Sequence, residues 1–196
     1  MTALAALALA ARLAATPPAE ARPPDVLLIT VDTLRPDALG WVSGRAGTPN
    51  LDRLATEGFR FAGAVAPAPL TLPSHITLMS GLAPPRHGVR NNGEQLAQGP
   101  RLLPEALGAA GYATAAFVSG FPLSRPFGLD RGFSHYDDTL TAGEGAWLER
   151  PAAETTAAAL AWLDEAARPW FLWIHYYEPH TPYAAHPEGG GVASDG

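Results

Sequence analysis

A threonine, a proline and a histidine lie close together in Thr71-Leu72-Pro73-Ser74-His75, and these residue types could do nucleophilic chemistry at the start of a helix. Pro73 is typical of a first helical turn, because its missing N–H would have no partner there. Gly81 favours the left-handed conformation that ends a helix. The spacing therefore predicts a helix with Thr71 at its N-terminus, where free N–H groups and the helix dipole attract an anion. A simple helix cap is the alternative for such a threonine.

A second candidate is Asp32, which follows the apolar run 26–31. A continuous run of this kind predicts a parallel-sheet strand buried on both faces. A carboxylate at the carboxyl end of such a strand lies where open α/β sheets bind their ligands. Asp32 could equally cap a following helix, and this stretch alone leaves both interpretations open.

If Asp32 and Thr71 meet, they form a plausible centre for ester cleavage. A carboxylate is a hard ligand suited to Ca²⁺, Mg²⁺, Mn²⁺ or Zn²⁺, and a metal beside the Thr71 hydroxyl would favour a nucleophilic alkoxide. An amide such as that of Asn92 would hold the other oxygens of a tetrahedral anion. This is the chemistry of phosphate or sulfate esters. Four histidines are further candidate ligands, acids or anion contacts, although each taken alone is more often structural: His75, His87, His175 and His180.

The elements that must position these residues alternate along the chain. Periodicity and punctuation predict helices at 48–58, 102–110 and 151–167, strands at 26–31, 59–65, 113–118 and 170–177, and a loop at 121–138. This alternation indicates an α/β fold with a mostly parallel sheet and helices on both faces. We expect three polar positions to converge on one sheet edge: Asp32, the region before Thr71, and His180.

Composition excludes several other functions. The net charge of −6, without a basic cluster, argues against a nucleic-acid-binding surface. All 13 basic residues are arginine and there is no cysteine, so lysine chemistry, thiolate metal sites and disulfides are absent from this chain.

Residues 1–21 are predicted to be a signal peptide. They are rich in Ala and Leu and end in Ala19-Glu20-Ala21, a small-residue pattern typical of a cleavage site. The apolar run is too short to span a bilayer. We therefore expect export to the periplasm or outside the cell, or a cytoplasmic protein if the leader is not a signal, with residues 22–196 forming the catalytic part.

Five segments, in order, resemble the amino-terminal part of the sulfatase family in the alkaline phosphatase superfamily. They are 27–35, 48–55, 111–115, 127–133 and 171–183, the last running from Phe171-Leu172-Trp173-Ile174-His175 to Pro179-His180-Thr181-Pro182-Tyr183. The resemblance implies an alkaline phosphatase-like fold, with Asp32 as a divalent-metal ligand. It places Thr71 at the nucleophile position and His180 at a substrate-contacting position.

The chain departs from the sulfatase pattern at the nucleophile. Sulfatases carry a Cys or Ser that becomes formylglycine in a Cys-x-Pro-x-Arg motif, whereas this chain has Thr71 and, in place of the Arg, His75. Threonine is a secondary alcohol and cannot be oxidised to an aldehyde. The second Asp of the family's Asp-Asp pair is Thr33, and the catalytic Lys is absent.

These departures resemble the nucleotide pyrophosphatase/phosphodiesterase branch of the same superfamily. That branch has a Thr-x-Pro-x-His nucleophile segment and an Asn that holds the phosphoryl group. The matching positions are Thr71, Pro73, His75, Gly81, Pro84, His87, Gly88 and Asn92.

Together these features predict a sulfatase-like, metal-dependent hydrolase of sulfate or phosphate (di)esters. We assign Thr71, His75 and His180 to catalysis, Asn92, Arg35 and His87 to substrate binding, and Asp32 and Thr71 to the metal. The metal would be Ca²⁺, or Zn²⁺ or Mn²⁺ given the threonine, and the substrate a small-molecule, glycan or lipid ester. The family's remaining metal ligands come from later strands, so we expect the chain alone to be an inactive amino-terminal fragment. The alternatives are a non-catalytic remnant or interaction module of the same fold, and a transferase of a phosphoryl-linked headgroup.

Overall fold

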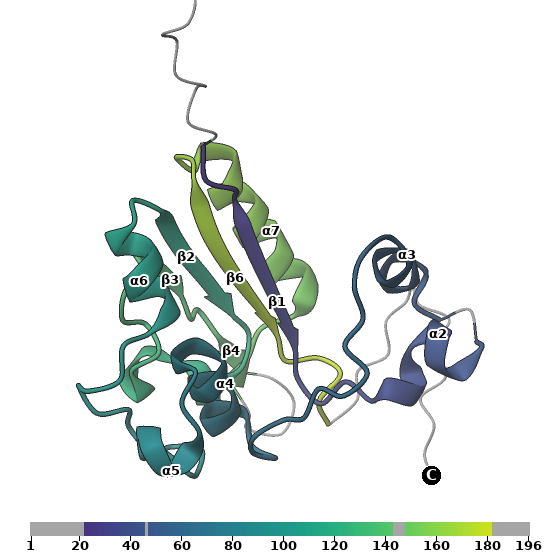
Figure 1. Ribbon diagram of the computed structural model, residues 1–196, viewed down its shortest axis with the longest axis horizontal. Helices are drawn as coiled ribbons and strands as arrows, with labels where there is room; N and C mark the ends of the chain where they lie inside the picture. The colour runs from purple at the N-terminus through teal and green to yellow at the C-terminus, as the bar shows by residue number, and fades with distance from the viewer. Residues whose placement is uncertain (1–21, 46, 143–147, 182–196) are drawn as a thin grey trace, which may run out of the picture.

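A four-stranded parallel sheet forms the centre of the molecule (Figure 1). The computed structural model describes residues 22–45, 47–142 and 148–181. The strands are β1 (Val26–Val31), β2 (Ala113–Val118), β3 (His135–Asp137) and β6 (Trp170–Tyr176), in the spatial order β1-β6-β2-β3. The predicted α/β fold with a mostly parallel sheet is confirmed. The predicted signal peptide and the segment 182–196 lie outside the described residues.

Helices and short elements connect these strands. They are η1 (Pro36–Ala38), α2 (Gly40–Ser43), α3 (Pro49–Glu57), α4 (Thr71–Ser80), α5 (Pro84–His87), α6 (Leu103–Ala109), η2 (Phe121–Leu123), η3 (Arg125–Phe127) and α7 (Ala152–Glu165), with a small antiparallel pair of β4 (Thr141–Ala142) and β5 (Leu148–Glu149). No helix in the described part of the chain has the length and apolar character needed to cross a bilayer.

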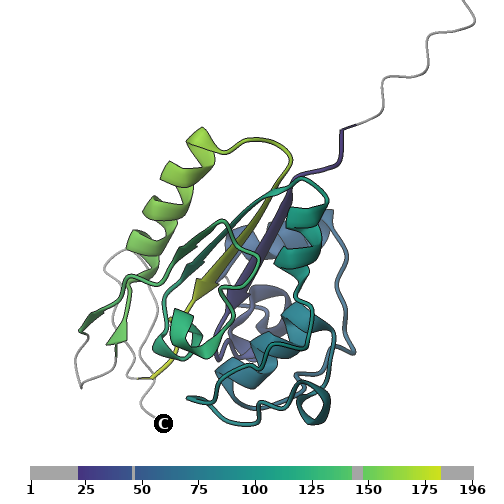
Figure 2. The same cartoon turned by 90° about the vertical axis from the view of Figure 1, so that its left-hand side faces the viewer.

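Helices cover both faces of the sheet, as predicted (Figure 2). On one face α4 and α6 enclose the larger core, in which Leu72 and Ile76 pack with Trp173 and Phe171 of β6. On the other face α7 covers β2 and β6, where Ala159 packs with Phe117 and Leu172. Strand β6 is therefore buried from both sides and carries the polar residues at its carboxyl end into the interior.

The prediction that strand 26–31 is buried on both faces was wrong. β1 is an edge strand among the described residues, and Leu27 and Ile29 are 50% and 48% exposed. Side chains alternate along a strand, so Val26 and Leu28 reach the larger core while Leu27 and Ile29 face the α7 side. The buried residues of α7 pack over β2 and β6, which leaves this face of β1 uncovered.

The predicted strand at 59–65 was also wrong. The segment forms no strand, and Phe59, Phe61 and Val65 are between 84% and 95% exposed. Its alternating pattern pairs with no strand: β1 pairs with β6, and the other edge of β1 carries no strand among the described residues. Conversely, the predicted loop 121–138 contains β3, three residues that pair with β2.

Candidate active site

Asp32 and Thr71 meet at the carboxyl end of β1. The Thr71 hydroxyl donates a hydrogen bond of 2.8 Å to Asp32 Oδ2. The backbone N–H of Asp32 donates to the Tyr176 carbonyl at 2.9 Å, which extends the β1–β6 pairing by one residue and fixes the start of the Asp32 side chain. The chain then turns away at Thr33, which has a positive φ of 51°. The two candidate residues, far apart in sequence, are therefore in direct contact.

The geometry of α4 argues against the simple cap for Thr71. The N-cap residue of α4 is Leu70, which is extended and makes no side-chain capping hydrogen bond. At the other end, Gly81 ends α4 with φ 69°, as predicted. Thr71 is the first helical residue and its hydroxyl is directed to Asp32. The N–H of Leu72 donates to Asn92 Oδ1 at 2.9 Å, so Asn92 lies at the same helix N-terminus.

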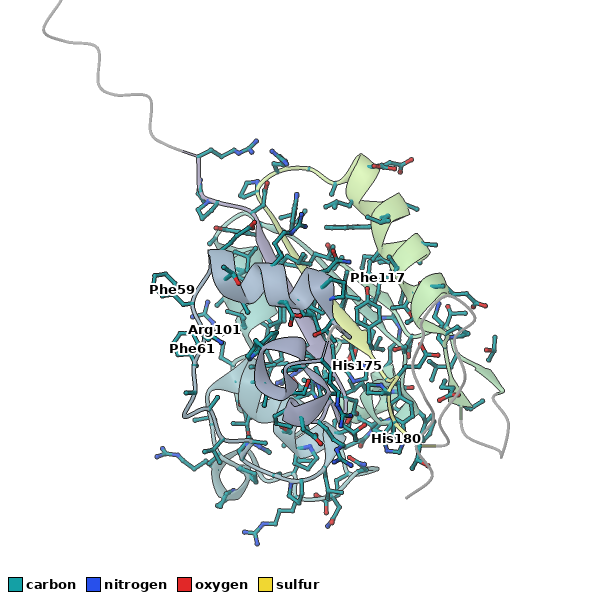
Figure 3. All side chains as sticks on the ribbon, turned by 90° about the vertical axis from the view of Figure 1, so that its right-hand side faces the viewer. Phe59, Phe61, Arg101, Phe117, His175 and His180 are labelled. Atoms are coloured by element: carbon teal, nitrogen blue, oxygen red, sulfur yellow. The ribbon has the colours of Figure 1, made fainter. Side chains whose placement is uncertain are left out.

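His175 is buried beside the Asp32 carboxylate. Its Nε2 lies 3.6 Å from Asp32 Oδ2, beyond hydrogen-bond distance, and both ring nitrogens are buried without a hydrogen-bond partner. Burial lowers the pKa of His175, which keeps the ring neutral. Figure 3 shows where His175 lies along β6, near the carboxyl end of the sheet.

The Asp32 carboxyl is held in its ionised form. Burial works to raise its pKa, but contact with His175 and the hydrogen bond from Thr71 outweigh burial and lower the pKa below its usual value. The site thus combines an ionised carboxylate, a neutral imidazole and a hydroxyl.

His75 lies one helical turn after Thr71 and is bound to it. Its Nδ1 is 2.7 Å from the Thr71 carbonyl oxygen, and since a carbonyl only accepts, Nδ1 carries the proton. Burial lowers the pKa of His75 to about 4, so the ring is neutral near pH 7. Its ring meets that of His175 edge-on, with the centroids 5.0 Å apart.

His180 lies just beyond β6 (Figure 3). Its Nδ1 is 2.6 Å from the Thr181 carbonyl oxygen, and its ring stacks on Tyr177 with a centroid separation of 4.4 Å and an interplanar angle of 16°. His180 therefore lies near the carboxyl end of β6, where it contacts Tyr177. No contact between His180 and Thr71 is seen among the described residues.

The other two predicted substrate-binding residues have partners within the protein. The exposed Arg35 guanidinium pairs with Asp37 at 2.7 Å. His87 is buried, and its Nδ1 accepts from the Val89 N–H at 3.2 Å, which leaves Nε2 to donate to Thr77 Oγ1 at 3.1 Å. Substrate contact by Arg35 and His87 stays a prediction.

The donor set at Asp32 fits part of a divalent-metal site. The carboxylate and the Thr71 hydroxyl place two hard oxygens 2.8 Å apart. Within residues 22–45, 47–142 and 148–181, no group of three or more His, Cys, Asp or Glu side chains is arranged to hold a metal ion. Asp32 and Thr71 would therefore supply two of the ligands of such a site.

Two residues that support the site were not predicted as site residues. The buried Ser119, just after β2, donates to the His175 carbonyl at 2.6 Å and accepts from the Tyr177 N–H at 2.8 Å. Tyr177 carries the ring that stacks on His180. The only sequence signal was their position, since Ser119 directly follows the predicted strand 113–118 and Tyr177 is the last residue of the predicted strand 170–177.

Comparison with known proteins gives the family. The model of the sulfatase family matches residues 24–190. Steryl-sulfatase of Mus musculus is 43% identical over 91 residues, which are 46% of this chain and 14% of that protein. Among solved structures, BT4656 in complex with its substrate D-glucosamine-2-N,6-O-disulfate has a TM-score of 0.71 at 24% identity, covering 85% of this chain and 36% of that one.

A phosphonate monoester hydrolase of Agrobacterium radiobacter has a similar fold, with a TM-score of 0.66 at 26% identity over 84% of this chain and 43% of that one. This chain thus spans about a seventh of the steryl-sulfatase and less than half of either solved structure. The match of the family model over most of the chain, on a parallel sheet with Asp32 and Thr71 at its edge, establishes that this chain belongs to the sulfatase family.

Proposed function

We propose that this chain carries the nucleophile of a metal-dependent hydrolase of phosphate or sulfate esters, with phosphate diesters as the preferred class. The observation that carries the proposal is the 2.8 Å hydrogen bond from Thr71 Oγ1 to the ionised Asp32 carboxylate at the start of α4. A hydroxyl in contact with a carboxylate, at a helix N-terminus that favours anions, has the surroundings of an activated nucleophile.

In the first step, Thr71 Oγ attacks the phosphorus or sulfur atom and the bond to the leaving ester oxygen breaks. The hydroxyl proton moves along the existing hydrogen bond to Asp32 Oδ2, and the released alkoxide takes a proton from solvent and leaves as an alcohol. A divalent metal bound by Asp32 and Thr71 would supply positive charge that favours the deprotonated oxygen. In the second step, water attacks the same phosphorus or sulfur atom and the bond from that atom to Thr71 Oγ breaks. Oγ takes back the proton held by Asp32, and the proton lost by the attacking water goes to solvent.

The neighbouring groups have distinct roles in this proposal. Asn92 accepts from the Leu72 N–H through Oδ1, which directs its side chain to the helix N-terminus, where its amide would contact the transferred group. Neutral His75 holds the Thr71 carbonyl and so supports the backbone of the nucleophile. His180 would contact the substrate from the segment after β6.

Threonine as nucleophile favours phosphorus over sulfur. A phosphothreonine can be hydrolysed by attack of water on phosphorus, whereas a sulfate ester of threonine is harder to turn over. The formylglycine hydrate of sulfatases solves that problem, and Thr71 cannot form it. The similarity to a phosphonate monoester hydrolase supports the preference, while the named sulfatase relatives support sulfate esters of small molecules or glycans as the second candidate class.

The test is a substrate panel on the protein made from its complete reading frame, with and without added Ca²⁺, Mn²⁺ or Zn²⁺. We expect an aryl phosphodiester to be cleaved faster than the matching aryl sulfate, with activity lost on chelation. Turnover of the sulfate without turnover of the phosphodiester would contradict the preference. The absence of both activities would favour the non-catalytic remnant, and product formed only with an added sugar or lipid acceptor would favour the transferase.

A further inference from the structure

The segment that follows β6 holds its histidine by a stacked pair of rings. Tyr177 is buried, whereas His180 is half-buried, and their rings lie 4.4 Å apart at 16° from parallel. Offset stacking of aromatic rings at this distance is attractive and restricts the plane of the more mobile partner. Because Tyr177 is the more buried ring, it is the fixed member of the pair.

Tyr177 is itself fixed by the end of β2. Its N–H donates to Ser119 Oγ at 2.8 Å, and the same oxygen donates to the His175 carbonyl at 2.6 Å, so Ser119 connects the two residues that flank Tyr176. The Ser119 side chain is fully buried, which makes these bonds costly to lose.

Gly120 makes room for the tyrosine ring. A Cβ at this position would lie 2.5 Å from Cδ2 of Tyr177. The Gly120 backbone has φ −131°, which any residue can adopt, so the ring and not the backbone requires a glycine here. Ser119 and Gly120 together form a support for Tyr177.

The same segment is fastened on its other side by α7. Glu178 Oε2 accepts from the N–H of Ala152, the first residue of α7, at 3.1 Å. A carboxylate in this position also interacts favourably with the positive end of the helix dipole. The backbone between Tyr177 and His180 is thus held at two points, one on β2 and one on α7.

A second contact, with the Thr181 carbonyl, determines which edge of the His180 ring faces outward. Its Nδ1 lies 2.6 Å from the Thr181 carbonyl oxygen, and because that oxygen can only accept, Nδ1 carries a proton. In the tautomer with this proton, the lone pair lies at Nε2, the nitrogen on the far side of the ring from Thr181. The stack sets the plane of the ring and the Thr181 contact sets which edge faces outward.

We propose that Tyr177, supported by Ser119 and Gly120, is a positioning residue that fixes the ring plane of His180 and presents Nε2 to the substrate in one orientation. The orientation of the His180 ring by Tyr177 does not depend on the function of the protein. The effect of that orientation on catalysis rests on the function proposed above.

The test compares four variants by NMR of the His180 ring, assigned with His180→Gln. Tyr177→Leu removes the stack, Tyr177→Phe keeps it, and Gly120→Ala pushes the ring away. Tyr176→Leu is the matched control, because the neighbouring Tyr176 packs on the α7 side, where its hydroxyl lies 2.8 Å from Thr156 Oγ1.

We expect the parent, Tyr177→Phe and Tyr176→Leu to show His180 ring protons shifted upfield by the stacked ring, with ¹⁵N shifts of a single tautomer protonated at Nδ1. Tyr177→Leu and Gly120→Ala should lose the upfield shift. In the complete enzyme these two variants should lower kcat/KM about two- to tenfold, the effect expected from the interaction energy of one aromatic pair. Tyr177→Phe should keep the kcat/KM of the parent.

An unchanged His180 spectrum in Tyr177→Leu would overturn the proposal whatever the activity of the protein. A changed spectrum with unchanged kcat/KM would also overturn it, because His180 would then be oriented to no effect. If instead the spectra follow expectation while Thr71→Ala keeps full turnover, the proposed nucleophile fails and the orientation of His180 by Tyr177 stands.

Discussion

Helices α3 and α4 carry similar sequence signals, yet they have different surroundings. Both have a proline in the first turn and a glycine at the end, with leucines on the helix. Half of α4 is buried, including Leu72, Ile76 and Met79, whereas α3 has no buried residue. Figure 1 shows α2 and α3 beyond the β1 edge, away from the strands that α4 covers.

Polar contacts replace apolar burial in the α2–α3 region. Thr48 Oγ1 donates to Asp52 Oδ1 at 3.0 Å and accepts from the Gly40 N–H at 2.8 Å, while the Trp41 N–H donates to the same carboxylate oxygen at 3.2 Å. These bonds hold the two short helices to each other. α4 is instead built into the core, which is why its N-terminal residue can hold a hydroxyl in a fixed position against Asp32.

The largest difference should appear in a matched pair of leucine substitutions. Leu72→Ala in α4 removes a fully buried side chain and should lower the free energy of unfolding by about 2–5 kcal/mol. Leu54→Ala in α3 removes a side chain that is 64% exposed and should change it by no more than about 0.5 kcal/mol. Urea unfolding monitored by tryptophan fluorescence measures both, and equal losses would break the comparison.

The second prediction concerns pH, because α4 carries a buried histidine and α3 carries none. The folded pKa of His75 is about 4, below its usual 6.5, so the unfolded chain binds the proton more readily. Its contribution to stability is complete above about pH 6.5 and is lost as the pH falls toward 4. The parent should lose about 3 kcal/mol through this group over that range.

The variant His75→Gln, whose amide can still donate to the Thr71 carbonyl, isolates that contribution. The stability of the parent minus that of the variant should shrink as the pH falls from 7 to 4. Urea titrations at both pH values provide the measurement. A constant difference would mean that His75 does not titrate as its burial demands.

The smallest expected effect lies in the α2–α3 region. Asp52→Ala removes the acceptor for Trp41 N–H and Thr48, and should weaken the local structure by about 1 kcal/mol. Hydrogen exchange should show faster exchange at the Trp41 amide, with the amides of β6 unchanged. Faster exchange throughout β6 would show that the two regions are coupled more strongly than their contacts suggest.

Sequence reasoning succeeded where a local signal and the sheet agreed. The strands at 26–31, 113–118 and 170–177 were predicted from apolar runs, and Asp32 lies at the end of its predicted strand. Asp32 and Thr71 do meet, but Thr71 arrives on α4 and not after the strand predicted at 59–65. Gly81 correctly predicted the end of α4, because this ending depends on one local property, the left-handed conformation of the glycine.

The errors have a common physical cause, which is that pairing and cover are not local. Residues 59–65 alternate like a strand but have no neighbour to pair with, and β1 is apolar on a face that α7 does not reach. The three residues of β3 form a strand only because β2 lies beside them. Likewise, nothing near Ser119 indicates that its hydroxyl joins His175 to Tyr177 across the sheet.

The most direct test of the central claim is the rate of ester cleavage by Thr71→Ala and Thr71→Ser in the complete enzyme. Serine keeps a hydroxyl that can donate to Asp32, so we expect Thr71→Ser to retain measurable turnover. Thr71→Ala should lose at least about a thousandfold in kcat, as expected for removal of a nucleophile. Equal turnover by the alanine variant and the parent would contradict the claim that Thr71 is the nucleophile.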